Sequence, residues 1–238
     1  MAFSAFRGLF RLASAGAMIT AFRSLNTSAV DAFIRNQYGG HLQYLTIQGL
    51  FIAIATMLIG VLTDVIPPLR HGGLILSDGP ASLRSFRRSL FIAAMPLAVI
   101  ISSIYWTLLV FFPDLIIASD VSATPEPTSS DAAPVPFRLP LSIDLGLHAV
   151  PALSLLLDFL VFEKKYSRKE VNIHVPVVVA LYAVFYGLWV EHCASRNGNI
   201  FPYPFLTQNP LKVRIVIYAG AAFLAFGSFK LLNRVHPR

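Results

Sequence analysis

Long runs of apolar residues alternate with short polar segments along the whole chain. A helix needs about 20 apolar residues to cross a lipid bilayer. Four runs reach that length, at residues 42–66, 90–112, 141–162 and 173–193. A further run at 213–232 and a weaker one at 8–30 bring the expected number of spans to six. Because lipid offers no hydrogen-bonding partner to an open backbone, these spans are predicted to be helices.

The predicted fold class is therefore all-α, a polytopic membrane helix bundle of six transmembrane helices in one integral membrane domain, 1–238. Only 13% of the residues are charged, against about 25% in soluble domains. The net charge of +7 comes from basic residues that cluster near the helix ends. This pattern predicts contact with the bilayer and its anionic headgroups, and no nucleic acid partner.

The sequence contains one cysteine, Cys193. An internal disulfide is therefore excluded, and a thiolate metal site is not expected. There is also no glycine-rich phosphate loop, no His-Glu-x-x-His motif and no Gly-x-Ser-x-Gly motif. We therefore expect the function of this protein to require no metal and no cofactor.

The N-terminal segment has two interpretations. It contains Arg7, Arg11 and Arg23, many alanines and serines, and no acidic residue before Asp31. This composition is typical of a mitochondrial presequence. It equally fits a weakly apolar first transmembrane helix at 8–30, and composition alone leaves both open.

Charge asymmetry predicts the orientation. With six helices, the basic loops after the second and fourth helices and the basic C-terminal tail lie on one side of the membrane. The acidic, Pro/Ser-rich loop at 113–140 lies on the other side, and its part at 122–136 is expected to be disordered. The positive-inside rule then places both termini in the cytoplasm, although Arg196, Lys212 and Arg214 fall on the outer side. The expected location is the endoplasmic reticulum or the plasma membrane.

Two polar side chains lie inside predicted spans near the same membrane face. At about 1.5 Å of rise per residue, Thr46 and His148 both lie within roughly 10 Å of the outer boundary. A hydroxyl and an imidazole at one depth suit a nucleophile and its base. Asp144 precedes His148 by four residues, so it lies on the same helical face and can hold the imidazole in one tautomer. Glu191 and His192 reach the same level at the end of another span.

Each of these residues also has a purely structural interpretation. A threonine in a membrane helix usually bonds a carbonyl of its own helix or packs as a small residue. His148 lies close enough to the boundary to be interfacial, and Glu191 and His192 are suited to anchoring at headgroup level. Asp64, at the inner end of the second span, is expected to be interfacial.

A set of short motifs, in order from Tyr38 onward, resembles the androgen-induced membrane protein family. These motifs are Tyr38-Gly39-Gly40, Gln43-Tyr44-Leu45-Thr46, Leu62-Thr63-Asp64, Ser85-Phe86-Arg87-Arg88, Pro96, Tyr105-Trp106, His148 with Pro151, Tyr166-Ser167-Arg168, Leu188-Trp189-Val190 and Tyr203-Pro204-Phe205-Leu206. Each motif is short and weak alone, and the ordered set is more specific. The resemblance also implies that the N-terminal segment is a first helix.

Members of this family hydrolyse fatty-acid esters of hydroxy fatty acids. The resemblance implies that Thr46 is the nucleophile, that His148 is its base and that the substrate is a lipid. Two departures from the family pattern concern the substrate range more than the type of reaction. Asp144-Leu145 stands where the family often has Asn-His, and the Pro/Ser-rich insert is longer than usual. The alternative function is a non-catalytic multi-span membrane protein, either a lipid carrier or a scaffold.

Overall fold

The computed structural model describes residues 2–65, 83–116 and 139–237. The predicted disordered segment at 122–136 lies outside these residues. The long helices are α1 (Ala2–Leu25), α3 (Leu45–Val65), α5 (Leu83–Phe111), α6 (Leu141–His148), α7 (Val150–Phe162), α8 (Val175–Arg196) and α10 (Leu211–Val235). The short ones are α2 (Ala29–Arg35), α9 (Pro204–Thr207), the 3-10 turns η1 (Gly40–Gln43) and η2 (Pro113–Leu115), and the π-helical turn η3 (Glu170–His174). No strand occurs in these three described ranges, so the all-α prediction is confirmed.

Four helices are long and apolar enough to cross a membrane, or five if the bent pair α6 and α7 counts as one span. The prediction of a polytopic membrane bundle is confirmed, but the count of six spans is not. The predicted span that is missing from this count is α1, because its arginines lower its mean hydropathy below that of a typical span. The run predicted at 141–162 is broken by a 41° bend. Pro151 lies in the first turn of α7 and cannot donate a backbone hydrogen bond, which explains the break.

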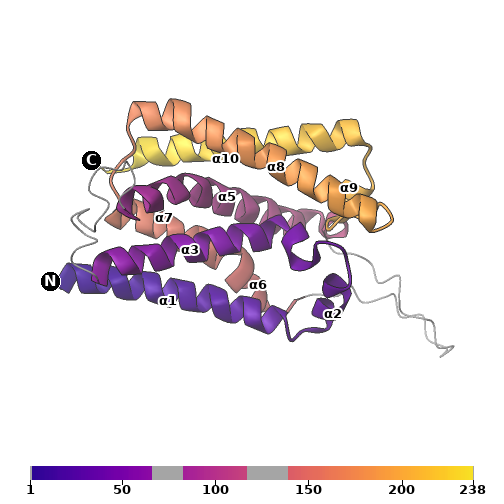
Figure 1. The fold of residues 1–238 in the computed structure, drawn as a ribbon, viewed down its shortest axis with the longest axis horizontal. Helices are drawn as coiled ribbons and strands as arrows, with labels where there is room; N and C mark the ends of the chain where they lie inside the picture. Colours follow the sequence, from indigo (N-terminus) through magenta and orange to yellow (C-terminus); the bar gives the residue numbers. More distant parts are fainter. Residues whose placement is uncertain (1, 66–82, 117–138, 238) are drawn as a thin grey trace.

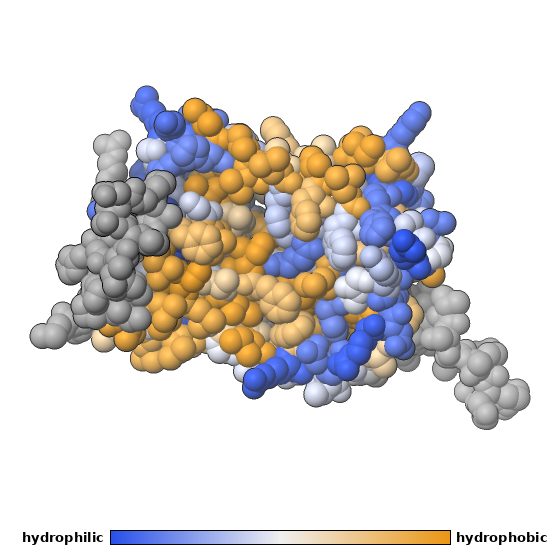
Figure 2. All heavy atoms as spheres, in the orientation of Figure 1, coloured by the Kyte–Doolittle hydropathy of each residue, from blue (hydrophilic) through white to orange (hydrophobic). Residues whose placement is uncertain are grey.

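The long helices run roughly along one axis, and both chain ends lie at the same end of the bundle (Figure 1). We call this the terminus end, and the opposite end, where α3 begins and α8 finishes, the pocket end. In Figure 2 orange side chains cover much of the middle of one face, and blue ones lie mostly toward its two ends. Both chain ends lie at the terminus end of the bundle, and the placement of this end on the cytoplasmic side of a membrane stays a prediction.

The outer helices expose large apolar side chains that a soluble protein would bury. On α10 Val216 is 69% exposed and Phe223 74%, and on α8 Leu188 is 69% exposed. Contiguous apolar surface of this kind marks contact with a membrane or another protein. Together with the hydropathy of the helices, this exposure supports an integral membrane protein.

A cluster of buried charges joins four helices near the terminus end. The guanidinium of Arg11 on α1 donates to Asp64 on α3 and to Asp158 on α7, at 2.8 Å in each case. Arg87 on α5 pairs with Asp158 and with Glu163, which directly follows α7. Arg11 and Asp64 are each 2% exposed, and Asp158 is fully buried. Asp64 was expected to be interfacial, but these pairs place it inside the bundle.

The helices approach closely at two glycines. A Cβ added to Gly60 of α3 would lie 2.8 Å from Arg11 Cδ and from Arg87 Nε, so only glycine leaves room for both guanidinium groups. A Cβ added to Gly146 of α6 would lie 2.4 Å from the Cβ of Ala21 on α1. The first helix is thus packed into the bundle at both ends.

Removing one charge from the cluster should destabilise the bundle strongly. Asp158→Asn leaves Arg11 and Arg87 short of a buried partner charge, and breaking a buried pair in this way typically costs about 3–5 kcal/mol. Arg35→Gln is the matched control, because Arg35 pairs with Asp31 while remaining 66% exposed, and such surface pairs contribute about 0–1 kcal/mol. Thermal unfolding of the detergent-solubilised protein should show a large drop for Asp158→Asn only. Equal, small drops for both variants would show that the cluster contributes little to stability.

Candidate active site

A glycine turn and an aromatic loop position the start of α3, where Thr46 lies. Gly39 has φ of +85°, and Gly40 has φ of +48°, both in the left-handed region that favours glycine. A Cβ on Gly39 would also lie 2.6 Å from Cys193 Sγ on α8. The turn therefore brings the start of α3 directly against the end of α8. This is the physical reason for a Gly-Gly pair a few residues before Thr46.

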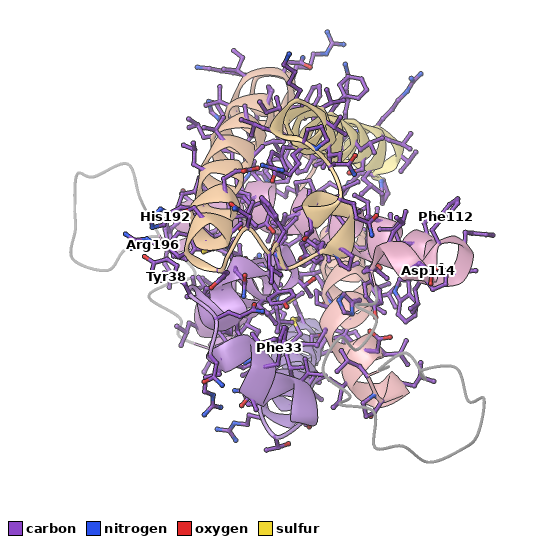
Figure 3. The ribbon with its side chains drawn as sticks, turned by 90° about the vertical axis from the view of Figure 1, so that its right-hand side faces the viewer. Phe33, Tyr38, Phe112, Asp114, His192 and Arg196 are labelled. Carbon is purple, nitrogen blue, oxygen red and sulfur yellow. The ribbon has the colours of Figure 1, made fainter. Side chains whose placement is uncertain are left out.

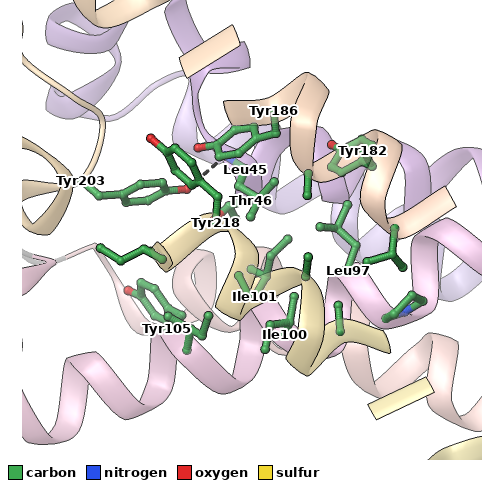
Figure 4. A pocket seen from close by; sticks show the side chains of 18 of the residues that line it. Leu45, Thr46, Leu97, Ile100, Ile101, Tyr105, Tyr182, Tyr186, Tyr203 and Tyr218 are labelled. Carbon is green, nitrogen blue, oxygen red and sulfur yellow. Dashed lines mark hydrogen bonds between the residues drawn. The ribbon is translucent and has the colours of Figure 1, made fainter. Parts of the chain in front are cut away.

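The first backbone N–H groups of a helix have no acceptor within the helix. At the start of α3, the N–H of Leu45 donates to the hydroxyl oxygen of Tyr203 at 3.0 Å. Tyr203 comes from the loop before α9, 158 positions away in the sequence. Burial raises the pKa of Tyr203, and hydrogen bonds from the side chain and backbone of Thr46 oppose that rise. Thr46 is the next residue after Leu45, and Figure 4 shows its side chain beside the Tyr203 phenol.

Thr46 differs from three other threonines in the helices. Thr20, Thr56 and Thr63 each donate to a carbonyl three or four residues earlier in their own helix, at 2.7–2.8 Å. For Thr46 the carbonyl four residues earlier belongs to Leu42, which already accepts from Gln48 Nε2 at 2.7 Å and Trp189 Nε1 at 2.9 Å. The Thr46 side chain shares the lining of a pocket with Tyr203.

Thr46 lines a pocket between α3, α5, α8 and α10 (Figure 4). Its cavity volume is about 140 Å³, and an apolar cavity of about 150 Å³ is large enough to bind benzene. Most of the lining is aliphatic, and the polar groups are Thr46 and five tyrosines. These tyrosines are Tyr105, Tyr182, Tyr186, Tyr203 and Tyr218.

Three of the tyrosine hydroxyls are fixed by partners. Tyr182 donates to Gln48 Oε1 at 2.8 Å, Tyr186 to the carbonyl of Gln43 at 3.2 Å, and Tyr218 to Glu191 Oε1 at 3.1 Å. Their polar ends are thus satisfied by protein groups, and their rings form the walls. The pocket is apolar in its depth and polar where Thr46 lies.

His148 is the last residue of α6, at the bend before α7. It is 7% exposed, and its Nδ1 lies 2.8 Å from Oδ1 of Asp144, which is 6% exposed. The predicted contact between these two residues is present. The imidazole also stacks on the Tyr105 ring with centroids 3.4 Å apart. Since Tyr105 lines the pocket, His148 lies directly behind one of its walls.

The structure brings the two predicted residues to the same pocket, one in its lining and one behind it. Within the described part of the chain, no hydrogen bond joins Thr46 to His148. The imidazole contacts Asp144 and Tyr105, and Thr46 lines the pocket beside Tyr203. Catalytic pairing of Thr46 with His148, and an orienting role for Asp144, therefore stay predictions.

Glu191 and His192 have structural partners at the pocket end. Arg214 donates to both carboxylate oxygens of Glu191 at 2.7 Å. His192 Nε2 lies 3.2 Å from the hydroxyl of Tyr38, and the two side chains meet beside Arg196 in Figure 3. These contacts fix α8 to α10 and to the segment before α3. No group of three or more His, Cys, Asp or Glu residues suited to a metal occurs in the described ranges.

Sequence reasoning missed two sets of residues. The charge cluster had a signal, because Asp158 lies inside an apolar run, where an ionisable residue calls for a partner. The sequence signal for the pocket tyrosines was weaker, since a tyrosine near a helix end is usually an interfacial anchor. Tyr203 belonged to a recognised motif, but its position over α3 depends on how the aromatic loop folds.

The described structure is that of an integral membrane helix bundle with a pocket between its helices. The family model described as FAR-17a/AIG1-like protein matches residues 3–237, so the chain belongs to this family and the resemblance to androgen-induced membrane proteins is confirmed.

Two curated relatives are named only as UPF0641 membrane proteins. That of Schizosaccharomyces pombe is 30% identical over 222 residues, which cover 92% of this chain and 85% of the relative. That of Saccharomyces cerevisiae is 25% identical over 200 residues, covering 84% and 78%. No solved structure matches the chain.

Alanine at Gly39 should disturb the site more than alanine at Gly40. Both glycines have positive φ, so both substitutions strain the backbone, but only at Gly39 would the new Cβ also meet Cys193 Sγ. Gly39→Ala should therefore lower the melting temperature of the solubilised protein further than Gly40→Ala. At Gly40 the added methyl group would lie in open space, so only the left-handed backbone conformation would reduce the free energy of unfolding, by about 1 kcal/mol. A larger drop for Gly40→Ala would contradict the close approach of α3 and α8.

Proposed function

We propose that this protein is a membrane-embedded hydrolase that cleaves fatty-acid esters of hydroxy fatty acids, with Thr46 as nucleophile and His148 as base. The observation that carries the proposal is the place of Thr46. It lines a mostly aliphatic pocket together with Tyr203, whose phenol oxygen is hydrogen-bonded to the preceding residue, Leu45. A hydroxyl at the edge of such a pocket is placed to meet the ester group of a lipid.

The shape of the pocket suits a lipid ester. Along α5 the lining extends from Ala93 to Leu108, a rise of about 22 Å. Half of the hydrocarbon core of a bilayer is about 15 Å thick. Part of a fatty acyl chain can therefore lie along α5, α8 and α10, while its ester group remains beside Thr46, where water from the membrane surface has access.

The proposed reaction has two steps. His148 Nε2 takes the proton of Thr46 while Oγ1 forms a bond to the ester carbonyl carbon, and the hydroxy fatty acid leaves after regaining that proton from His148. The acyl group remains on Thr46. In the second step His148 takes a proton from water, which attacks the acyl carbonyl; the bond from the acyl carbon to Thr46 Oγ1 breaks, His148 returns the proton to Oγ1, and the free fatty acid leaves. Asp144 holds Nδ1–H at 2.8 Å, which leaves the Nε2 lone pair for both transfers.

The proposed mechanism requires a change at Tyr105 before His148 can reach Thr46. Its ring covers the face of His148 and forms part of the pocket wall. For His148 to act as base, the Tyr105 ring has to move aside or one water has to bridge the imidazole and Thr46.

A lipid carrier is the second candidate, and the mostly aliphatic lining of the pocket favours it. A carrier binds the same ester but makes no use of the Thr46 hydroxyl. The rate of ester hydrolysis by variants at Thr46 and His148 therefore distinguishes a hydrolase from a carrier.

Thr46→Ala and His148→Ala should each abolish hydrolysis of a fatty-acid ester of a hydroxy fatty acid. The double variant should be hardly worse than either, because residues that act as a unit have strongly non-additive effects. The measurement is release of free fatty acid by purified protein in lipid nanodiscs, with folding checked by size-exclusion chromatography. Wild-type turnover by folded Thr46→Ala would refute the hydrolase and favour the carrier.

Conservative variants should give a graded result. Thr46→Ser retains a hydroxyl and should keep part of the activity. Asp144→Asn should be less damaging than His148→Ala, because the amide oxygen still accepts from the imidazole N–H but no longer stabilises an imidazolium by charge. Initial rates on the same ester provide the ranking. If Asp144→Asn were as inactive as His148→Ala while remaining folded, Asp144 would have more than an orienting role.

A further inference from the structure

The phenol of Tyr203 lies over the N-terminus of α3, beside Thr46. Its oxygen accepts from the N–H of Leu45 at 3.0 Å, the bond drawn as a dashed line in Figure 4. Tyr203 and Thr46 also line the same pocket. One side chain from the loop before α9 is thus joined to the turn of helix that carries the proposed nucleophile.

Neighbouring rings hold this phenol in place. The Tyr203 ring is stacked on Phe205, with centroids 5.5 Å apart and planes within 12°. On the other side it meets Tyr44 edge-on, with centroids 5.7 Å apart. Pro204 follows directly and restricts the backbone conformation of Tyr203. The hydroxyl therefore has a fixed position relative to α3, as a positioning group requires.

A threonine hydroxyl needs such a group at this site. A free side chain rotates among staggered positions, and the carbonyl of Leu42 is already occupied by Gln48 and Trp189. Without Tyr203, the first turn of α3 would also lose the acceptor of the Leu45 N–H.

We infer that Tyr203 is a positioning residue, whose phenol oxygen holds the Thr46 hydroxyl toward the pocket for attack on the ester carbonyl. The inference rests on the proposed function, because it concerns the geometry of the same nucleophile. Tyr203 exchanges no proton with the substrate and forms no bond to it. Its contribution is to the rate of the chemical step, and substrate affinity comes from the aliphatic lining.

Tyr203→Phe tests the inference, with Tyr166→Phe as the matched control. Both variants remove one tyrosine hydroxyl that bonds a backbone group, but Tyr166 lies outside the pocket lining, and its hydroxyl donates to the carbonyl of Arg88 at 3.1 Å. Misplacement of a reacting group by about 1 Å typically costs about 100-fold in rate. We therefore expect Tyr203→Phe to lower kcat by about 10- to 100-fold with KM nearly unchanged, and Tyr166→Phe to leave kcat within about twofold of wild type.

Two further measurements exclude a merely structural effect. The rate of covalent labelling by a fluorophosphonate probe should fall with kcat in Tyr203→Phe, while its elution as a folded protein should match wild type. Replacement of Tyr203 by 4-aminophenylalanine keeps a hydrogen-bonding group at the para position of the ring and should give a kcat between those of wild type and Tyr203→Phe. If Tyr203→Phe does not fold, the comparison of the 4-aminophenylalanine variant with Tyr166→Phe decides the question.

The outcomes separate this inference from the proposed function. If Thr46→Ala is inactive and Tyr203→Phe has the kcat of wild type or a higher one, Tyr203 does not position Thr46, although the hydrolase stands. If Thr46→Ala turns over at the wild-type rate, both the hydrolase and the role of Tyr203 are wrong. A rise in KM with unchanged kcat in Tyr203→Phe would make Tyr203 a substrate-binding residue and would overturn the inference.

Discussion

The buried ion pairs of Arg11 and Arg87 are the constraint on which the arrangement of this bundle depends. The two guanidinium groups contact Asp64, Asp158 and Glu163, and so connect α1, α3, α5 and the end of α7. Charges inside an apolar bundle are costly unless every one has a partner. The helices are therefore restricted to the registers in which these groups meet, and Gly60 provides the space in which they do.

This constraint at one end of the bundle has consequences at the other. Because α3 and α7 are aligned at the terminus end, the start of α3 and the bend between α6 and α7 lie at the pocket end, with α1 packed against both α3 and α6. Thr46 and His148 belong to these two places. Local features then complete the site: the Gly39 turn against Cys193, the phenol of Tyr203 on the first turn of α3, and Tyr105 against the imidazole.

The sequence predicted the fold class well because long apolar runs have few alternatives to membrane helices. It was less informative where tertiary contacts decide. Arg7 and Arg11 fitted a presequence as well as a helix, and their buried partner Asp64 lies more than 50 positions away. The i, i+4 contact of Asp144 with His148 was predictable from helical spacing. The contact of Tyr203 with α3 was not, because it spans 158 positions and depends on the fold of an irregular loop.

The central claim is that the Thr46 hydroxyl attacks the ester, and the most direct test is to locate the covalent intermediate or its analogue. The solubilised wild-type protein would be treated with a fluorophosphonate, digested and analysed by mass spectrometry. The account predicts an adduct on the peptide that carries Thr46, with the modification on Thr46 itself, and competition by the lipid ester. An active protein whose adduct lies on another residue, or that forms no adduct while it hydrolyses the ester, would contradict the account.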